Sequence, residues 1–384
     1  MRKFDKVGVV GAGAMGIGIV QVALSAGSEV LLYDTNPSQL QKSIEGLDRQ
    51  LKRLVEKGKL QEETKNQMLQ RLHQVSELSE FRSCDLLIEA IVENAKIKKE
   101  VFKALELEVS SSCILASNTS SISITSLGSD LQHPERFIGI HFFNPAPLMP
   151  LVEIIPSLMT KRDLAKELVE ILRSWGKEPV IAKDLPGFIV NRIARPFYGE
   201  ALRLVEENLA TPEEIDFVMK SKGGFRMGPF ELMDLIGIDV NFAVTQSVYH
   251  DFFYDPKYKP SLLQQRMSEA KQLGRKTGRG FYSYPREENS EPLNIEDSKV
   301  ESIFMRILSM LVNEALEAKR LAVATDEDLE LAMLRGVNYP KGLLAWGKEI
   351  GYKSVFETLN ALYIRYQEER YRSSPLLQDL SKIS

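Results

Sequence analysis

Several residue types are scarce in this sequence. Its 384 residues include two cysteines, Cys84 and Cys113, and four histidines. The cysteines form no C-x-x-C motif, and no group of residues has the spacing of metal ligands. Because each cysteine lies beside an apolar run that predicts a buried strand, we expect two inert thiols in a reducing compartment rather than a disulfide framework.

The sequence also lacks a strong charge bias and long apolar runs. Its 49 basic and 53 acidic residues give a net charge of −4, so bulk charge favours no nucleic-acid partner. No apolar stretch is long enough to predict a membrane span. Met1–Lys3 before an apolar run resembles the start of a signal peptide, but a glycine-rich turn interrupts that run. We therefore expect a cytoplasmic protein of two or three domains.

The first forty residues carry the strongest local signal. The pattern predicts a strand at Lys6–Val10, a glycine turn at Gly11–Gly16 and a helix at Ala14–Ala26. A second strand at Glu29–Tyr33 follows and ends at the acidic residue Asp34. The turn has the pattern G-x-G-x-x-G, and Asp34 follows its last glycine by 18 residues. This combination is typical of a dinucleotide-binding unit.

Each part of this stretch has a physical role. Gly11 permits a tight turn, Gly13 lets the backbone approach a pyrophosphate at the helix N-terminus, and Gly16 lets helix and strand pack closely. Asp34 can accept hydrogen bonds from both ribose hydroxyls and repels a 2′-phosphate, which favours NAD over NADP. The alternative is an ordinary strand–turn–helix without a ligand. The candidate cofactor contacts in the turn are Gly11, Gly13, Ala14, Met15 and Gly16.

Further apolar runs predict more strands of the same sheet. They lie at Asp85–Val92, Cys113–Ala116, Phe137–His141, Leu151–Ile155 and Pro179–Ala182, with a helix over Lys96–Leu107. Strands that alternate with helices after a glycine turn predict an α/β domain of Rossmann type with a doubly wound sheet. We place this domain at residues 1–184.

The segment from Pro37 to Leu78 departs from that alternation. Its apolar residues follow helical spacing, interrupted at Gly58, which predicts two antiparallel helices projecting from the fold. The basic residues that we assign to the first helix are Lys52, Arg53, Lys57 and Lys59. A solvated helix face is one interpretation, and a clamp for a phosphate-bearing substrate is the other.

From Pro186 onward the sequence predicts helices, and it repeats itself. Residues 300–378 match residues 186–264 at a constant offset of 114 without gaps. Matched segments include Glu200–Leu202 with Glu314–Leu316, Ile236–Gly237 with Ile350–Gly351, and Leu262–Gln264 with Leu376–Gln378. The repeat predicts two tandem all-α domains, at residues 185–285 and 296–384, joined by a polar linker over Pro285–Asp297.

Two residues of the predicted sheet indicate acid–base chemistry. His141 ends a buried strand, at the edge of a sheet where ligands bind. Glu153 lies in an apolar strand, where a carboxylate is costly unless it is paired. The two strands are joined by a proline-rich loop, so the side chains can lie side by side. The carboxylate would fix the imidazole tautomer and leave the other ring nitrogen to move the proton of an alcohol. A purely structural His–Glu pair is the alternative.

Together these motifs resemble the L-3-hydroxyacyl-CoA dehydrogenases. The resemblance covers nearly the whole chain, through GAGAMG (11–16), EAIVEN (89–94), SNTSS (117–121), HFFNP (141–145), LVEII (151–155), DLPGFIVNR (184–192) and GRKTGRGFY (274–282). It implies reversible, NAD-dependent oxidation of (3S)-3-hydroxyacyl-CoA to 3-oxoacyl-CoA. An acyl-CoA partner and a place in fatty acid metabolism and β-oxidation follow from the same resemblance.

The resemblance also implies roles for single residues. His141 matches the catalytic base and Glu153 its paired carboxylate. Ser120 and Asn191 match groups that hold the 3-hydroxyl or 3-keto oxygen, although each could instead be a helix cap or turn residue. The matched cofactor positions are Asp34, Glu93, Lys98 and Asn144, with Lys276 as a further candidate. Lys57 lies near a position that contacts CoA.

The second helical copy departs from the small members of the family, which end near residue 285 of this numbering and pair as dimers. Asn191-Arg192 in the first copy becomes Met305-Arg306 in the second, so the polar site residue is lost. We predict that the second copy replaces the dimer partner and allows a monomer, with a homodimer as the alternative. Two other interpretations stay open: a dehydrogenase of a free hydroxy acid or sugar acid, and an NAD-binding protein with an inactive site.

Overall fold

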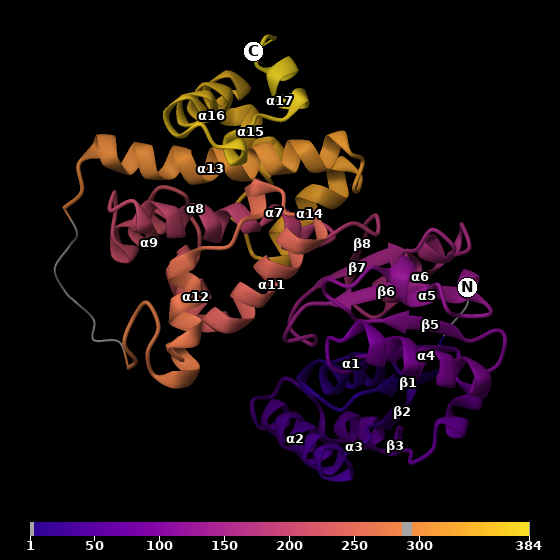
Figure 1. The fold of residues 1–384 in the computed structure, drawn as a ribbon. Helices are drawn as coiled ribbons and strands as arrows, with labels where there is room; N and C mark the ends of the chain where they lie inside the picture. The colour runs from indigo at the N-terminus through magenta and orange to yellow at the C-terminus, as the bar shows by residue number, and fades with distance from the viewer. Residues whose placement is uncertain (1–3, 286–293, 384) are drawn as a thin grey trace. The chain divides into compact units, whose positions relative to one another are not determined.

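The computed structural model describes residues 4–285 and 294–383, and the chain divides into two compact units, Met1–Leu185 and Pro186–Ser384 (Figure 1). Met1–Lys3 and residues 286–293 of the predicted linker lie outside the described residues. In the described part of the chain, no helix is both long and apolar enough to cross a membrane.

The first unit is built on an eight-stranded sheet with the order β3-β2-β1-β4-β5-β6-β7-β8. The strands are β1 (Lys6–Val10), β2 (Glu29–Tyr33), β3 (Leu72–Gln74), β4 (Leu86–Glu89), β5 (Ile114–Ser117), β6 (Phe137–Phe142), β7 (Leu151–Pro156) and β8 (Glu178–Ile181). All neighbouring strands are parallel except β6 and β7, which are antiparallel. The strand order reverses between β1 and β4, which is the switch point where doubly wound sheets bind ligands. The predicted α/β fold of Rossmann type is confirmed.

The strands carry apolar side chains on both faces of the sheet, and helices cover both faces and bury them. The helices are α1 (Ala14–Ser25), α2 (Pro37–Glu56), α3 (Glu62–Gln70), α4 (Ala95–Glu108), α5 (Ile124–Gly128) and α6 (Leu164–Ser174), with short 3₁₀ turns at Leu78–Ser83 and Pro134–Arg136. Residues of α1, α2 and α6 share one core with Val7, Val9 and other strand residues. On the other face, Phe102 of α4 packs edge-on against Phe137 at a centroid distance of 4.7 Å.

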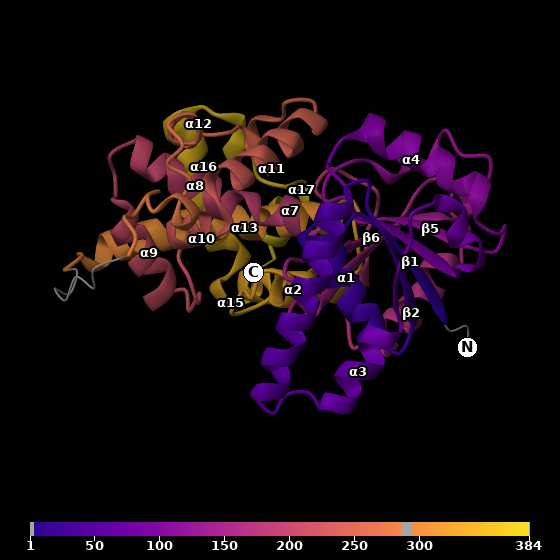
Figure 2. The ribbon, with the colours of Figure 1, turned by 90° about the horizontal axis from the view of Figure 1, so that it is seen from below.

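The predicted helix pair after β2 is present but shorter than expected. Figure 2 shows α2 and α3 as a hairpin that extends away from the sheet. The prediction of helix was wrong at the end of the segment Pro37–Leu78, because Leu72–Gln74 pairs with β2 as the edge strand β3. His73 lies in this strand. Two of the four basic residues assigned to the first helix, Lys57 and Lys59, lie beyond its last residue, Glu56.

The described residues of the second unit form helices and short turns, with isolated β-bridges that join Arg279 to Gly274 and to Ser283. The first set is α7 (Val190–Ile193), α8 (Arg195–Glu206), α9 (Pro212–Ser221), α10 (Pro229–Ile236), α11 (Ile238–Asp251) and α12 (Leu262–Glu269), with 3₁₀ turns at Pro256–Tyr258 and Arg275–Thr277. The second set is α13 (Asp297–Arg320), α14 (Asp326–Gly336), α15 (Leu343–Ile350), α16 (Tyr352–Tyr366) and α17 (Pro375–Leu380), with a 3₁₀ turn at Glu369–Tyr371. In Figure 1, α13 runs alongside α8.

The backbone of the second unit repeats with the same offset as its sequence. Helices α10 and α15 begin and end 114 residues apart. Residues with positive φ recur at that offset, in the pairs Asn208 and Ala322, Gly224 and Asn338, Gly237 and Gly351, and Phe253 and Gln367. The matched rings of Phe225 and Tyr339 also contact each other edge-to-face, with their centroids 5.0 Å apart. The two copies are therefore related by an internal pseudo-two-fold axis that passes near these rings.

Candidate active site

The glycine turn after β1 leaves open space where a phosphate would lie. At Gly11, where φ is +106°, a Cβ atom would lie 2.5 Å from the carbonyl oxygen of Ala90. At Gly16 a Cβ atom would lie 1.8 Å from the carbonyl oxygen of Gly11. At Gly13, by contrast, no other group in the described chain comes within 4 Å of the Cβ position. The turn thus needs two of its glycines for packing, and its third presents bare backbone at the start of α1.

Asp34 is held at this turn by backbone amides. Its Oδ2 atom accepts a hydrogen bond of 2.7 Å from the amide of Ala12, and its Oδ1 atom accepts one of 2.8 Å from the amide of Asn36. Each carboxylate oxygen can accept more than one hydrogen bond, so the group can still receive hydroxyl donors. This is the arrangement that a ribose-binding acid at the end of β2 requires.

A buried ammonium group organises the ends of β4 and β5. The Nζ atom of Lys98 lies 2.5 Å from Oε1 of Glu89 and 3.2 Å from Oε2 of Glu93. Lys98 and Glu89 are both buried, and the Ser117 hydroxyl donates to Glu89 at 2.6 Å. Because both buried charges are paired, the cluster can persist in the protein interior. It fixes Lys98 and Glu93 beside the predicted cofactor edge.

Glu93 in turn holds the loop that carries Ser120. Its Oε1 atom accepts hydrogen bonds from the Thr119 hydroxyl at 2.6 Å and from the Ser120 amide at 3.0 Å. Burial alone would raise the pKa of Glu93, but the Lys98 ammonium and these donors more than offset it and lower the pKa. The Ser120 hydroxyl lies 3.4 Å from the same oxygen. Ser120 is therefore placed by Glu93 at the carboxyl end of β5.

His141 and Glu153 lie directly opposite each other on the antiparallel strands β6 and β7. The Nδ1 atom of His141 is 2.7 Å from Oε2 of Glu153. Glu153 is fully buried and His141 is 6% exposed. A carboxylate oxygen accepts hydrogen bonds, so we assign Nδ1 as the donor, which leaves Nε2 directed away from Glu153. The side-by-side placement predicted from the sequence is confirmed.

The loop after β6 is fixed from two sides. The Asn118 side chain accepts a hydrogen bond of 2.8 Å from the Phe142 amide, which ties the end of β5 to the end of β6. Lys177 donates to the carbonyl oxygens of Ala146 at 2.5 Å and of Met149 at 2.9 Å. Burial lowers the pKa of Lys177 to about 8. Asn144 is exposed on this loop, two residues beyond β6.

In the second unit, Asn191 lies in the one-turn helix α7. Lys276 lies in the GRKTGRGFY segment and forms an ion pair of 2.6 Å with Asp239 at the start of α11. The same segment is shaped by the buried Asp234, which accepts hydrogen bonds of 3.0 Å from the amides of Phe281 and Tyr282. Within this unit, the first copy thus carries both Asn191 and Lys276.

Lys57 is the C-terminal cap of α2 and is exposed to solvent. Lys52, on the same helix, forms an ion pair of 2.7 Å with Asp48.

The two cysteines have the properties expected of inert thiols. Both are buried, and burial raises the pKa of Cys84 to about 12.

Three supporting residues were not predicted from the sequence: Glu89, Asn118 and Lys177. Glu89 had a detectable signal, because it is a carboxylate in the apolar run Leu86–Glu89, the same reason that singled out Glu153. Asn118 and Lys177 act on backbone groups that are distant in the sequence, so no local pattern could indicate them.

Comparison with known proteins assigns the chain to a family. Residues 6–185 match the family described as "3-hydroxyacyl-CoA dehydrogenase, NAD binding domain". Residues 187–284 and again 303–384 match "3-hydroxyacyl-CoA dehydrogenase, C-terminal domain". The chain belongs to the 3-hydroxyacyl-CoA dehydrogenase family. It is an NAD-dependent oxidoreductase of 3-hydroxyacyl-CoA, and its C-terminal domain is duplicated.

Individual relatives agree with this assignment to the 3-hydroxyacyl-CoA dehydrogenases. The chain is 36% identical, over 463 aligned positions, to 3-hydroxyadipyl-CoA dehydrogenase of Escherichia coli K12, covering 98% of each chain. It is 42% identical to 3-hydroxybutyryl-CoA dehydrogenase of Clostridioides difficile, covering 73% of this chain and 99% of that protein. The crystal structure of 3-hydroxybutyryl-CoA dehydrogenase from Escherichia coli K12 superposes with a TM-score of 0.95 at 35% identity, covering 100% of this chain and 99% of that one.

Proposed function

We propose that His141 is the acid–base residue of this dehydrogenase and that Glu153 holds and polarises it. The observation that carries the proposal is the buried hydrogen bond of 2.7 Å between Nδ1 of His141 and Oε2 of Glu153. In the oxidative direction, Nε2 of His141 takes the proton of the 3-hydroxyl group, and Glu153 stabilises the imidazolium that forms. In the reductive direction, the same nitrogen returns the proton to the oxygen.

Ser120 and Asn191 are proposed to hold the oxygen of the reacting carbon. A hydroxyl and an amide NH₂ can both donate to a carbonyl oxygen, whose negative charge grows as hydride arrives at the carbon. Glu93 accepts from the Ser120 amide at 3.0 Å and so supports this role for Ser120. Asn191 comes from the one-turn helix α7.

The chain's own residues fit NAD at the glycine turn. Gly13 offers bare backbone at the start of α1, and Asp34 offers a carboxylate for the ribose hydroxyls. When bound, the nicotinamide supplies a hydride acceptor or donor. Glu93, Lys98, Asn144 and Lys276 are proposed as the remaining contacts to the cofactor, together with Ala14 and Met15 of the turn.

The acyl substrate is proposed to be a CoA thioester with Lys57 near its phosphate groups. Lys57 is exposed at the end of α2, so a phosphate could reach it. Relatives that match the chain are named for 3-hydroxyadipyl-CoA and 3-hydroxybutyryl-CoA, so a short or medium acyl chain is the first to test. A monomer stabilised by the duplicated helical copy remains our proposal for the oligomeric state. The cytoplasmic location remains a prediction.

The decisive experiment is NADH oxidation, followed at 340 nm, with acetoacetyl-CoA as substrate. We expect turnover with NADH and the CoA ester, and little turnover with free acetoacetate or with NADPH. Turnover of free acetoacetate at the same rate would contradict the CoA-dependent assignment and favour a free hydroxy-acid dehydrogenase.

The role of His141 is tested by the variant H141A. We expect kcat to fall about 10²–10⁴-fold while the affinity for NADH stays unchanged, because general acid–base catalysis contributes about that factor. H133A is the matched control, since His133 is an exposed loop residue. An H141A enzyme that keeps wild-type kcat would reject the assignment.

A further inference from the structure

The two helical copies exchange a pair of buried ion pairs. Nε of Arg192 in the first copy lies 2.6 Å from Oε1 of Glu314 in the second. Nε of Arg306 in the second copy lies 2.6 Å from Oε1 of Glu200 in the first. The two arginines and the two glutamates are each 114 residues apart in the sequence. Each copy therefore supplies the carboxylate for the arginine of the other, as expected of a self-complementary two-fold interface.

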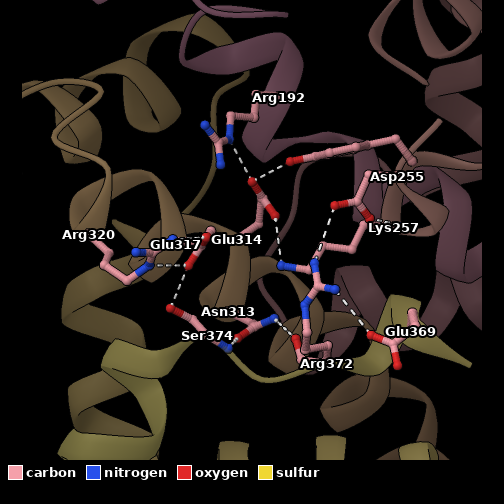
Figure 3. A network of polar contacts seen from close by, with 11 residues as sticks. Arg192, Asp255, Lys257, Asn313, Glu314, Glu317, Arg320, Glu369, Arg372 and Ser374 are labelled. Atoms are coloured by element: carbon pink, nitrogen blue, oxygen red, sulfur yellow. Dashed lines mark hydrogen bonds and ion pairs between the residues drawn. The ribbon is translucent and has the colours of Figure 1, made fainter. Parts of the chain in front are cut away.

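Glu314 is the centre of the polar network in Figure 3. Its side chain also accepts a hydrogen bond of 2.6 Å from the Tyr258 hydroxyl, and Nζ of Lys257 lies 3.8 Å from its second oxygen. Burial raises the pKa of Tyr258 well above its ordinary value, and Glu314 adds to the rise, so the tyrosine is a neutral donor. Glu314 is 2% exposed, as is Arg192.

Residues that flank Glu314 tie its helix α13 to the segment around Ser374 of the same copy. On the same helix, Asn313 accepts from the Ser374 amide at 2.7 Å, and Glu317 accepts from the Ser374 hydroxyl at 2.8 Å. The Arg320 guanidinium and the Ser374 hydroxyl, against the effect of burial, lower the pKa of Glu317 to about 2. Helix α13, which carries Glu314, is thus joined to the segment around Ser374 on both sides of Glu314 in the sequence (Figure 3).

Arg192 is paired with Glu314. Burial alone would lower the pKa of Arg192, but the Glu314 carboxylate more than offsets this and raises it. Its guanidinium lies over the Phe252 ring at 5.0 Å, and its Nη1 atom has no hydrogen-bond partner within the described chain. Arg306 differs, because it also binds both carboxylate oxygens of Glu207, at 2.8 and 3.0 Å.

Arg192 lies on a short helix, α7, next to Asn191. Helix α7 has only four residues and follows Gly187 and Phe188, both with positive φ. A single turn is not stable by itself, so its orientation depends on tertiary anchors. Arg192 is such an anchor, and the residue next to it is Asn191. The matched residue in the second copy is Met305, within the continuous helix α13.

From this asymmetry we propose that Glu314 of the second copy is a positioning residue for the reaction, acting on Asn191 through Arg192. The inference rests on the role proposed above for Asn191. It assigns the second copy a part in catalysis besides its part in the fold, because the carboxylate that anchors the active-site turn comes from the duplicated domain.

A double-mutant cycle in the full-length protein tests this proposal. E314Q is expected to lower kcat with acetoacetyl-CoA and NADH about tenfold to a hundredfold, because small displacements of a positioning group cost that much. N191A is expected to lower kcat about 10²–10³-fold. If Glu314 acts through Asn191, adding E314Q to N191A should change kcat by less than about twofold. The KM for NADH should stay unchanged in all variants.

The matched control is E200Q, which removes the equivalent carboxylate from the pair that anchors Met305 instead of Asn191. We expect E200Q to keep kcat within about twofold of wild type, even where it lowers the melting temperature. E314D, which restores the charge, should recover part of the kcat lost in E314Q. If E314Q does not fold, Y258F replaces it in the same cycle, with an expected loss of a few-fold that again vanishes in the N191A background.

Three results would overturn the proposal: wild-type kcat in folded E314Q, an equal loss of kcat in the presence and absence of Asn191, or equal losses in E314Q and E200Q. Failure of the proposed function is distinguishable, because the wild-type enzyme would then not turn over acetoacetyl-CoA at all.

Discussion

The two helical copies of the second unit share a backbone plan and differ at their beginnings. In the first copy, the segment that opens the domain is divided into the short α7 and the longer α8, with Pro196 at the start of α8. In the second copy, the equivalent segment is the single helix α13 of 24 residues, in which Met310 takes the place of Pro196.

That difference fits our proposal that Asn191 of the first copy contacts the substrate, while the second copy acts only through its contacts with the first. Proline within a helix removes a backbone hydrogen bond and favours a break, and the break leaves Asn191 on a short turn. The continuous helix α13 is the better scaffold, and it supplies Glu314 to the turn. We therefore propose that the first copy carries the polar residue of the site, Asn191, and that the second copy supports it.

The largest effect should follow from removing the second copy. Deleting residues 296–384 would expose apolar side chains of the first copy at the pseudo-two-fold axis, among them Phe197 and Phe225, whose rings contact Tyr339. We expect the truncated protein to aggregate or to form dimers, as measured by sedimentation velocity. A truncated protein that stayed monomeric, soluble and as heat-stable as the full chain would contradict the supporting role of the second copy.

Alanine substitutions at the matched positions 234 and 348 should lower the free energy of unfolding by different amounts in the two copies. Asp234 is buried and holds two amides and the Tyr284 hydroxyl, whereas its counterpart Lys348 is exposed. D234A should lower the free energy of unfolding by about 3 kcal/mol, because buried donors lose their acceptor. K348A should change it by less than about 0.5 kcal/mol. Urea unfolding measures the free energy of unfolding of both variants. Equal losses in D234A and K348A would contradict the expected difference between the two positions.

A third comparison concerns the carboxylates that cap α10 and α15. Asp216 accepts from the Phe230 and Glu231 amides at 2.9 Å, and Glu330 accepts from the matched Leu344 amide at 2.8 Å. Asp216 is buried, whereas Glu330 is half-buried. Burial raises the pKa of Asp216 to about 7, despite the amide donors that oppose the rise.

This raised pKa gives a pH dependence of defined sign. The native state binds more protons at Asp216 than the unfolded state does between about pH 4 and pH 7, so stability should fall as the pH rises through this window. Because one pKa unit corresponds to about 1.4 kcal/mol, we expect D216N to remove about 1 to 2 kcal/mol of the decline between pH 5 and pH 7. Urea unfolding at pH 5 and pH 7 measures this decline in the free energy of unfolding. The same decline in D216N as in the wild type would contradict the assignment of the pH dependence to Asp216.

The sequence was most informative where local patterns coincide with tertiary structure. The glycine turn, the alternation of strands and helices, and the apolar strand with Glu153 each have local signals, so the sheet and the His141–Glu153 pair were predictable. The 114-residue repeat likewise predicted the paired helices, because equivalent sequences adopt equivalent backbones.

Other features depend on contacts that no local pattern reveals. Residues 72–74 continue a helical sequence pattern, but pairing with β2 overrides it and makes them a strand. The exchanged ion pairs join residues more than 100 positions apart, so their partners could not be deduced, although both arginines and both glutamates recur in the repeat. Lys98 was predicted as a cofactor contact, but its ion pair with the buried Glu89 was seen only in the structure.

The most direct test of the division between the copies is kcat for N191A beside M305A, measured as NADH oxidation with acetoacetyl-CoA. We expect N191A to lower kcat about 10²–10³-fold, because the substrate oxygen loses a hydrogen-bond donor as negative charge develops on it. We expect M305A, at the matched position of the second copy, to keep kcat within about twofold of wild type. Equal effects at the two positions, or a larger effect at Met305, would contradict the proposed division between the copies.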